Sequence, residues 1–315
     1  MTAHAISTPA VWRRLWRSDA VHDLRHRPVA ALSLLIVVVY VAAAAFPDWV
    51  APHPVYDLST LDFADAFRPP VWLKDGTWRL PLGADDQGRD ILSAIIYGLR
   101  ISLAVSIAAV MLSLLIGVSL GLVAGFRGSA LDSIIMRVAD VQLTFPAMLV
   151  AVLLDGLVRA GLGSGMHARF AVWIIIIAVA LSGWVQYART IRAATMVEAG
   201  RDYVAAARLI GQPDRFILLR HILPNVTTPV FVLATIQVAV AIILESTLSF
   251  VGLGLPPTQP SLGTLIRVGN DYLMSGEWWI ALLPGFALLI LVLAVNLFGD
   301  WLRDILDPSL RRAGV

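Results

Sequence analysis

Long uncharged stretches of apolar residues recur along the chain. Each is long enough to cross about 30 Å of hydrocarbon as an α-helix. Because the backbone polar groups of a membrane span must be paired within the span, we expect helices here. The predicted spans are Val29 to Phe46, Ile101 to Ala124, Phe170 to Ala188, Val226 to Leu244 and Trp278 to Gly299.

A sixth stretch, between Arg137 and Arg159, is less regular. Asp140 and Asp155 bracket its uncharged part, and Pro146 interrupts it. Charges near the ends of a span can reach the interface at modest cost, so we expect a transmembrane helix here as well. The pattern therefore predicts an all-α, polytopic membrane protein with six transmembrane helices.

Lysine and arginine are unevenly divided between the two sides of these spans. With the amino terminus placed inside, 16 of the 24 Lys and Arg residues fall on the cytoplasmic side. Positive residues concentrate on that side of membrane proteins, so we expect both termini in the cytoplasm. The first span is longer than the apolar region of a signal peptide, and we expect it to be retained as an anchor.

The spans define the predicted organisation of the chain. The outer loop is rich in Pro, Asp and Trp, which predicts a small folded cap or an extended segment at the outer surface. The predicted parts are a cytoplasmic segment 1–28, a first transmembrane helix 29–46, an extracytoplasmic loop 47–100, a core of five transmembrane helices 101–302 containing a cytoplasmic loop 189–224, and a cytoplasmic tail 303–315.

The composition agrees with a membrane protein and argues against several kinds of site. Of the 315 residues, 58% are hydrophobic and 15% are charged, far from the profile of soluble domains. The net charge of +2 gives no polybasic surface, so we expect no nucleic acid partner. The chain has no cysteine and only scattered histidines, and its single lysine, Lys74, lies in no phosphate-binding loop. We expect no metal, no cofactor and no catalysis.

The cytoplasmic loop predicts two short helices. The first spans about Asp202 to Ile210, and Gly211 and Pro213 follow it as stop signals. The second spans about Asp214 to Ile222 and is expected to end before Pro224. Three consecutive alanines in the first helix would let another protein's backbone come close. The alternative is an amphipathic helix lying among lipid headgroups.

This loop resembles the EAA loop of binding-protein-dependent ABC importer permeases. The family pattern is E-A-A, three residues, G, nine residues, I-x-L-P. The matching positions are Ala206, Ala207, Gly211, Leu223 and Pro224. The Glu of the pattern is Ala205 here, and its Ile is His221.

Further segments resemble the C-type permease subunit of the dipeptide/oligopeptide branch in particular. They are Asp202 to Arg208, Arg220 to Asn225, Leu82 to Arg100, Glu245 to Gly254 and Asn296 to Leu310. The resemblance covers most of the chain. It implies the type I ABC importer permease fold in a prokaryotic inner or plasma membrane.

The same resemblance implies a non-catalytic permease subunit of an ATP-driven importer of dipeptides or oligopeptides. The implied partners are a homologous second permease subunit in a heterodimer, two cytoplasmic ATPases, an extracytoplasmic substrate-binding protein, a peptide substrate and the lipid bilayer. The residues implied to couple to an ATPase are Asp202, Tyr203, Val204, Ala205, Ala206, Ala207, Arg208, Leu209 and Gly211.

Two alternatives for the function stay open. Permeases of the same branch also carry nickel chelates or other small solutes. An ion-coupled secondary transporter belongs to a different class and would need charges in mid-span and related halves of inverted topology, neither of which is apparent in the sequence.

Polar residues outside the cytoplasmic loop supply two more candidate sites. Glu245 falls near the end of the fifth span, where a carboxylate is costly, so we expect it to face the bundle interior. It could accept structural hydrogen bonds or line the substrate pathway. A run outside the membrane predicts a solvated face or a docking site for the binding protein. Its members are Asp85, Asp86, Arg89 and Asp90.

Glycines repeat at helical spacing in the second span. Gly117, Gly121 and Gly125 would lie on one face of the helix. Small residues at this spacing let two helices approach closely in a membrane. We therefore expect a tight helix contact along this stripe.

Overall fold

The computed structural model describes residues 24, 26–55, 62–253 and 260–306. In this part of the chain every regular element is a helix, and the only β pairing is an isolated bridge between Ala84 and Asp90. The prediction of an all-α protein is confirmed. The cytoplasmic position predicted for both termini concerns residues outside the described ranges.

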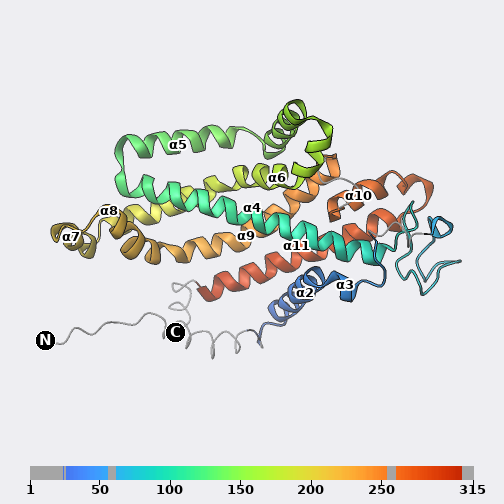
Figure 1. Ribbon diagram of the computed structural model, residues 1–315. Helices are drawn as coiled ribbons and strands as arrows, with labels where there is room; N and C mark the ends of the chain where they lie inside the picture. Colours follow the sequence, from blue (N-terminus) through green and yellow to red (C-terminus); the bar gives the residue numbers. More distant parts are fainter. Residues whose placement is uncertain (1–23, 25, 56–61, 254–259, 307–315) are drawn as a thin grey trace.

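The long helices lie side by side along one common direction (Figure 1). The elements, in chain order, are α2 Pro28–Ala45, α3 Pro47–Val50, η2 Phe63–Asp65, α4 Ile91–Arg127, α5 Ser129–Thr144, α6 Ala147–Ala199, α7 Asp202–Leu209, α8 Asp214–Phe216, the π-helix η3 Ile217–Ile222, α9 Leu223–Val251, α10 Leu262–Asn270, η4 Leu273–Ser275 and α11 Trp279–Leu306.

The five regular apolar stretches are confirmed as helices long enough to cross a membrane. They correspond to α2, α4, the Phe170–Ala199 part of α6, the Asp214–Val251 run that ends with α9, and α11. The helix α4 is longer than its uncharged stretch because Asp90 caps its first turn, accepting a hydrogen bond from the backbone N–H of Ser93 at 2.9 Å. Residues 91–100 therefore belong to a helix and not to the outer loop.

The sixth stretch is not a single helix. It consists of α5 and the first part of α6, to Gly161, and these two pieces meet at an angle of 91°. The prediction of one continuous helix is wrong here because Pro146 lacks a backbone N–H and keeps Phe145 out of the helical conformation, at φ −94° and ψ 120°. The chain thus has five membrane-length helices in its described part, or six spans if the bent pair counts as one.

The glycine stripe makes the predicted close contact. A Cβ atom added at Gly117 would lie 2.4 Å from the carbonyl oxygen of Trp184, and one at Gly121 would lie 2.6 Å from that of Ala188. Only glycine lets the backbones of α4 and α6 approach this closely. The contact makes α4 and α6 the central pair of the bundle.

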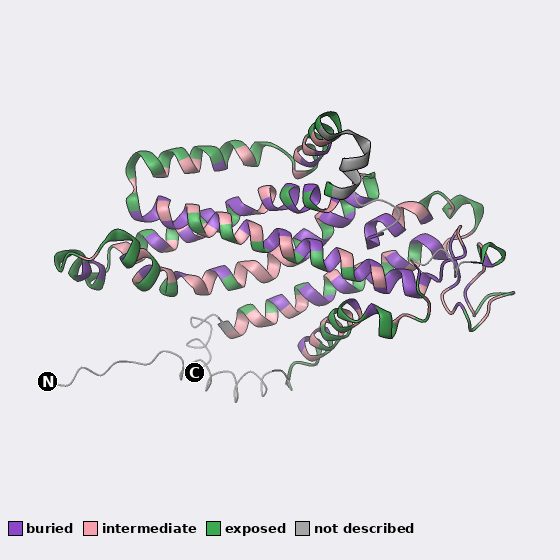
Figure 2. Ribbon diagram, viewed as in Figure 1, coloured by how far each residue is buried: buried purple, intermediate pink, exposed green. Residues whose placement is uncertain are grey.

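The helix α5 lies outside this pair and is largely exposed, as Figure 2 shows. Two ion pairs tie it to α6. One joins Asp132 to Arg192, and the other joins Asp140 to Arg189 at 2.6 Å. The remaining face of α5 is apolar and uncovered in the single chain, as expected for a surface that meets lipid or another membrane protein.

The second helix of the cytoplasmic loop does not end before Pro224. The three residues of α8 lead through the π-helix directly into α9, so Asp214–Val251 is one continuous helical run. Pro224 is the second residue of α9 and follows directly on the π-helical turn, where the helical hydrogen-bond pattern changes. The wider π-helical turn before it also leaves more room for the proline ring.

The two ends of the bundle differ in what they carry. In Figure 1, α7 and α8 lie at one end, beyond the point where α11 ends, whereas α3 and α10 lie at the opposite end. The 37 residues of α4 span about 55 Å as a helix, well over the roughly 30 Å of hydrocarbon. The two helical runs that flank α7, Phe170–Ala199 with 30 residues and Asp214–Val251 with 38, also exceed this thickness, at about 45 and 57 Å.

Candidate functional site

The short helix α7 forms where the sequence predicts it. Asp202 lies in its first turn and Arg208 in its last, which places a negative and a positive charge at the favourable ends of the helix dipole. Gly211 follows at φ +76°, a left-handed conformation that glycine adopts without strain. The predicted boundaries of this helix are confirmed.

One face of α7 is used inside the chain. Val204 and Ala207 are buried in a cluster with Phe126 of α4 and Ile191 of α6. The guanidinium of Arg208 lies over the Phe126 ring, 4.9 Å from its centroid. Two of the residues implied to couple to an ATPase therefore point inward and support α7, and they do not face a partner.

The opposite face of α7 is open. Ala205 and Ala206 are exposed, and beside them Leu209 and Ile210 are 88% and 73% exposed. Large apolar side chains at the tip of a projecting helix, next to alanines, are typical of a surface that another protein covers. In Figure 1, α7 lies at one end of the bundle, beyond the described end of α11.

Glu245 is fully buried and lies at the meeting point of three helices. Its carboxylate accepts hydrogen bonds from Ser249 Oγ at 2.8 Å and Ser246 Oγ at 3.3 Å, both on α9. The hydroxyls of Ser102 on α4 and Ser261 at the start of α10 face the same carboxylate. The prediction that Glu245 faces the bundle interior is confirmed.

The run outside the membrane is mostly buried, so the prediction of a solvated face is wrong for three of its members. The Nε of Arg89 lies 2.6 Å from Asp85 Oδ2, and both side chains are buried together with Asp90. The reason is local: Asp85 and Arg89 close a turn, and Asp90 caps α4. Their side chains lie inside the folded part of the outer loop, residues 62–90, which we call the outer cap.

Asp86 is the partly exposed member of this run. The hydroxyl of Tyr272, which follows α10, donates a hydrogen bond to its Oδ2 at 3.3 Å. Burial and the neighbouring charge of Asp85 raise the pKa of Asp86 above its ordinary value. The negative charge of Asp86 in turn raises the pKa of Tyr272. This contact joins the outer cap to the α10–α11 connection.

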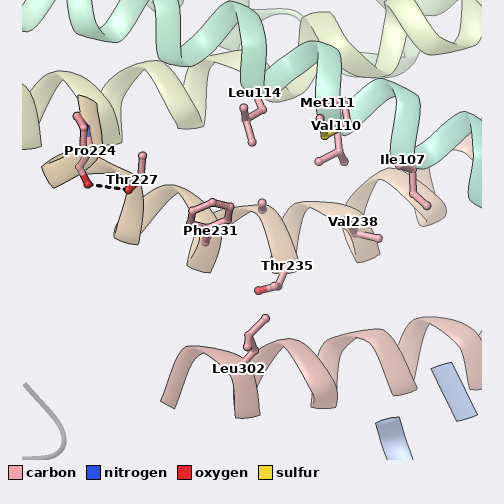
Figure 3. Close-up of a pocket in the computed structure, with 11 residues that line it drawn as sticks. Ile107, Val110, Met111, Leu114, Pro224, Thr227, Phe231, Thr235, Val238 and Leu302 are labelled. Carbon is pink, nitrogen blue, oxygen red and sulfur yellow. Dashed lines mark hydrogen bonds between the residues drawn. The ribbon is translucent and has the colours of Figure 1, made fainter. Parts of the chain in front are cut away.

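An apolar cavity of about 720 Å³ lies between α4, α9 and α11 (Figure 3). Its walls include Ile107 and Met111 from α4, Phe231 and Thr235 from α9, and Leu302 from α11. Thr235 donates its hydroxyl to its own helix, to a carbonyl at 2.8 Å. The lining carries no charged side chain among the described residues, so the cavity suits apolar groups.

The described residues hold no cluster of three or more His, Asp or Glu side chains arranged for a metal ion. The sequence did identify α7 and the burial of Glu245. It did not reveal the hydroxyls around Glu245 as a set, because Ser102, Glu245 and Ser261 are far apart in the chain and carry no common spacing. It also gave no signal for the cavity, whose lining residues look like any apolar helix positions.

Comparison with known families gives two matches. The model described as binding-protein-dependent transport system inner membrane component matches residues 117–312. The model described as N-terminal TM domain of oligopeptide transport permease C matches residues 11–70. Together they cover the first span, the cytoplasmic loop and the Glu245 region.

Two curated relatives are similar over nearly their whole length. The di/tripeptide transport system permease protein DppC of Pseudomonas aeruginosa is 39% identical over 306 residues, 97% of this chain and 94% of the relative. The dipeptide transport system permease protein DppC of Haemophilus influenzae is 35% identical over 283 residues, 90% of this chain and 91% of the relative.

A solved structure of the MetNI methionine ABC transporter in inward-facing conformations shares the fold. The superposition has a TM-score of 0.53 and covers 69% of this chain and 96% of that chain. The sequences are 18% identical, so this likeness concerns the fold alone.

Proposed function

This chain belongs to the family of binding-protein-dependent transport system inner membrane components, and from this premise we propose that it is the permease subunit of an ATP-driven importer of dipeptides and oligopeptides. As a member of this family with five or six apolar spans, it is a multi-pass protein of the bacterial inner membrane. The names of the two DppC relatives support peptides as the cargo and favour neither nickel chelates nor an ion-coupled transporter.

The observation that carries this proposal is the open face of α7. A cytoplasmic ATPase covers Ala205, Ala206 and Leu209, and the buried residues Val204 and Ala207 hold α7 against α4 and α6. The chain itself performs no catalysis, and ATP is hydrolysed by two such partner subunits. Movement of the ATPases drives α7 and thereby changes the arrangement of the spans.

A homologous second permease completes the transport pathway. The apolar cavity between α4, α9 and α11 is this chain's half of that pathway. Because Glu245 is enclosed by serines and does not line the cavity, it positions helices and does not touch the peptide. An apolar wall without fixed charges accepts peptides of many sequences, which leaves selection to the extracytoplasmic binding protein.

The binding protein docks at the opposite end, on the outer cap. Asp85, Arg89 and Asp90 shape this cap from within, and Asp86 is the member of the run that reaches its surface. A docking surface built on a buried ion pair keeps its shape when the partner binds, which lowers the entropy lost on association.

Reconstitution tests the proposal. The chain, its second permease and its ATPases are assembled in proteoliposomes with binding protein outside and ATP inside, and uptake of a labelled dipeptide is measured. We expect uptake that requires both ATP and the binding protein and that persists with a proton uncoupler. Uptake by the chain alone, abolished by the uncoupler, would overturn the proposal.

A further inference from the structure

Tyr203 makes polar contacts with both spans that flank the cytoplasmic loop. Its hydroxyl donates a hydrogen bond to Glu198 Oε2 at 2.7 Å, on the last turn of α6. The same hydroxyl accepts one from Asn225 Nδ2 at 3.2 Å, on the first turn of α9. One atom of α7 is thus linked to two helices that enter the membrane.

Asn225 and the residues before it make further contacts that hold the start of α9 in place. Asn225 Nδ2 also donates to the backbone carbonyl of His221 at 2.8 Å, within the π-helix. The His221 ring lies 3.0 Å, measured from Nε2, from Gln212 Oε1 in the turn after α7. The ring also lies edge-on to Phe216, with centroids 5.7 Å apart. The turn, the π-helix and the start of α9 therefore form one connected unit.

The link between Tyr203 and α6 is a short hydrogen bond to a charged group. The Glu198 carboxylate accepts the Tyr203 hydroxyl and lies 3.8 Å from the guanidinium of Arg201. A hydrogen bond to a carboxylate is stronger than one between neutral groups. Burial, followed by this bond to Glu198, raises the pKa of Tyr203, so its hydroxyl keeps the proton that it donates.

Apolar packing alone would hold α7 less specifically. Its buried face consists of Val204 and Ala207, two small side chains. Small apolar contacts let a helix slide, whereas hydrogen bonds fix direction and distance. The hydroxyl of Tyr203 fixes α7 at two points, one on each flanking span.

We propose that Tyr203 is a positioning residue that fastens α7 to α6 and α9 together, so that a displacement of α7 reaches both spans at once. This inference rests on the proposed contact between α7 and an ATPase. It assigns to one side chain of the loop a task other than contact with that partner. Without the hydroxyl, the ATPase still binds α7, but a displacement of α7 is transmitted to α6 and α9 only in part.

The test compares two Tyr→Phe variants in the full complex in proteoliposomes. Tyr203→Phe removes the hydroxyl and keeps the ring. The matched control is Tyr187→Phe, in the same apolar cluster, since the Tyr187 hydroxyl is buried and has no hydrogen-bond partner among the described residues. Three quantities are measured: capture of the ATPase by a photo-crosslinker at Leu209, basal ATP hydrolysis, and peptide taken up per ATP hydrolysed.

For Tyr203→Phe we expect unchanged capture at Leu209, with uptake per ATP lowered about fivefold, the factor that corresponds to one typical hydrogen bond. Asn225→Leu keeps the bond from Tyr203 to Glu198 and removes the link to α9, together with the bond from Asn225 to the His221 carbonyl, and it should lower uptake per ATP in the same way. Since both changes remove the same link between α7 and α9, uptake per ATP in the double variant should be little lower than in either single variant. The Tyr187→Phe control should behave as the unaltered protein.

The outcomes separate this inference from the proposed function. Normal uptake per ATP in Tyr203→Phe would overturn the inference while leaving the α7 contact intact. Loss of ATPase capture in Tyr203→Phe would also overturn it, because Tyr203 would then build the docking surface and not transmit its movement. Failure of the unaltered protein to capture an ATPase would instead overturn the proposed function.

Discussion

Two polar junctions, around Glu245 and around Tyr203, join helices in different ways. The Glu245 carboxylate is fully enclosed, with Ser246 and Ser249 as donors from its own helix and hydroxyls from α4 and α10 beside it. The Tyr203 hydroxyl lies in an exposed loop with one partner on each side. A hydrogen bond in a buried site is expensive to break, whereas water can replace one at an exposed site.

The difference assigns the two ends of the bundle to different tasks. The outer end, with the Glu245 cluster and the Asp85–Arg89 ion pair, is built to stay fixed. The opposite end, which we propose is moved by a partner, presents exposed apolar side chains on the short helix α7. Changes at the outer end should therefore affect stability, and changes at the cytoplasmic end should affect coupling.

The largest loss of stability is expected at the outer ion pair. Arg89→Ala leaves the buried Asp85 carboxylate without its cation, which should destabilise the outer cap by about 3–5 kcal/mol. Thermal unfolding followed by tryptophan fluorescence measures this. Arg189→Ala is the matched control, since both members of the Arg189–Asp140 pair are exposed, at 47% and 60%, and its removal should cost below about 1 kcal/mol. If the two changes lower the free energy of unfolding equally, the buried ion pair is no more important for stability than an exposed one.

A smaller loss is expected at the Glu245 cluster. Glu245→Ala leaves buried serine hydroxyls without an acceptor and should destabilise the protein by about 2–3 kcal/mol. Glu245→Gln keeps one acceptor oxygen and should cost about half as much. Hydrogen exchange at α10 locates the effect. A stable Glu245→Gln variant that fails in transport would instead indicate a carboxylate on the substrate pathway.

At the cytoplasmic end the expected effect is on assembly. Leu209→Asp places a charge on the exposed face of α7 and should weaken the affinity for the ATPase about 30-fold, as for an interface residue worth roughly 2 kcal/mol. Unfolding should be unaffected, because Leu209 is 88% exposed. Met274→Asp is the control: it introduces the same charge at a 97% exposed position on the outer end. If Met274→Asp weakens assembly equally, the effect is not specific to α7.

The smallest expected effect is a pH dependence of the outer cap. Because the folded state raises the pKa of Asp86, it favours the protonated carboxyl. The resulting stabilisation is complete below the unfolded pKa and is lost as pH rises through the higher folded pKa. The melting temperature should therefore fall as the pH rises from acidic to neutral, and Asp86→Asn should make this fall smaller. An unchanged slope would assign the decrease to another group.

Much of the fold was predictable because membrane spans can be recognised by their length and apolar composition. The helix α7 was predictable because its sequence has a helical pattern that ends at a glycine. The break at Pro146 was the exception. A proline inside an apolar stretch is compatible with a kinked span or with two separate helices, and only the packing of α5 against α6 through Arg189 and Arg192 decides between them.

The candidate site was predictable in part for a similar reason. Local spacing predicted the helix α7 but did not separate its buried residues, Val204 and Ala207, from its exposed ones. Burial of Asp85, Arg89 and Asp90 depends on how the outer loop folds back on itself. The residues around Glu245 come from three helices that only the tertiary structure brings together. A sequence read along one helix at a time cannot reveal such a set.

The claim that an ATPase covers the open face of α7 is tested most directly by a photo-crosslinking scan in membrane vesicles. The crosslinker is placed in turn at Ala205, Ala206 and Leu209, which are exposed, and at Val204 and Ala207, which are buried. The account predicts capture of a nucleotide-hydrolysing protein from the exposed positions and not from the buried ones. Capture of lipid alone from the exposed positions, or equal capture from all five, would contradict it.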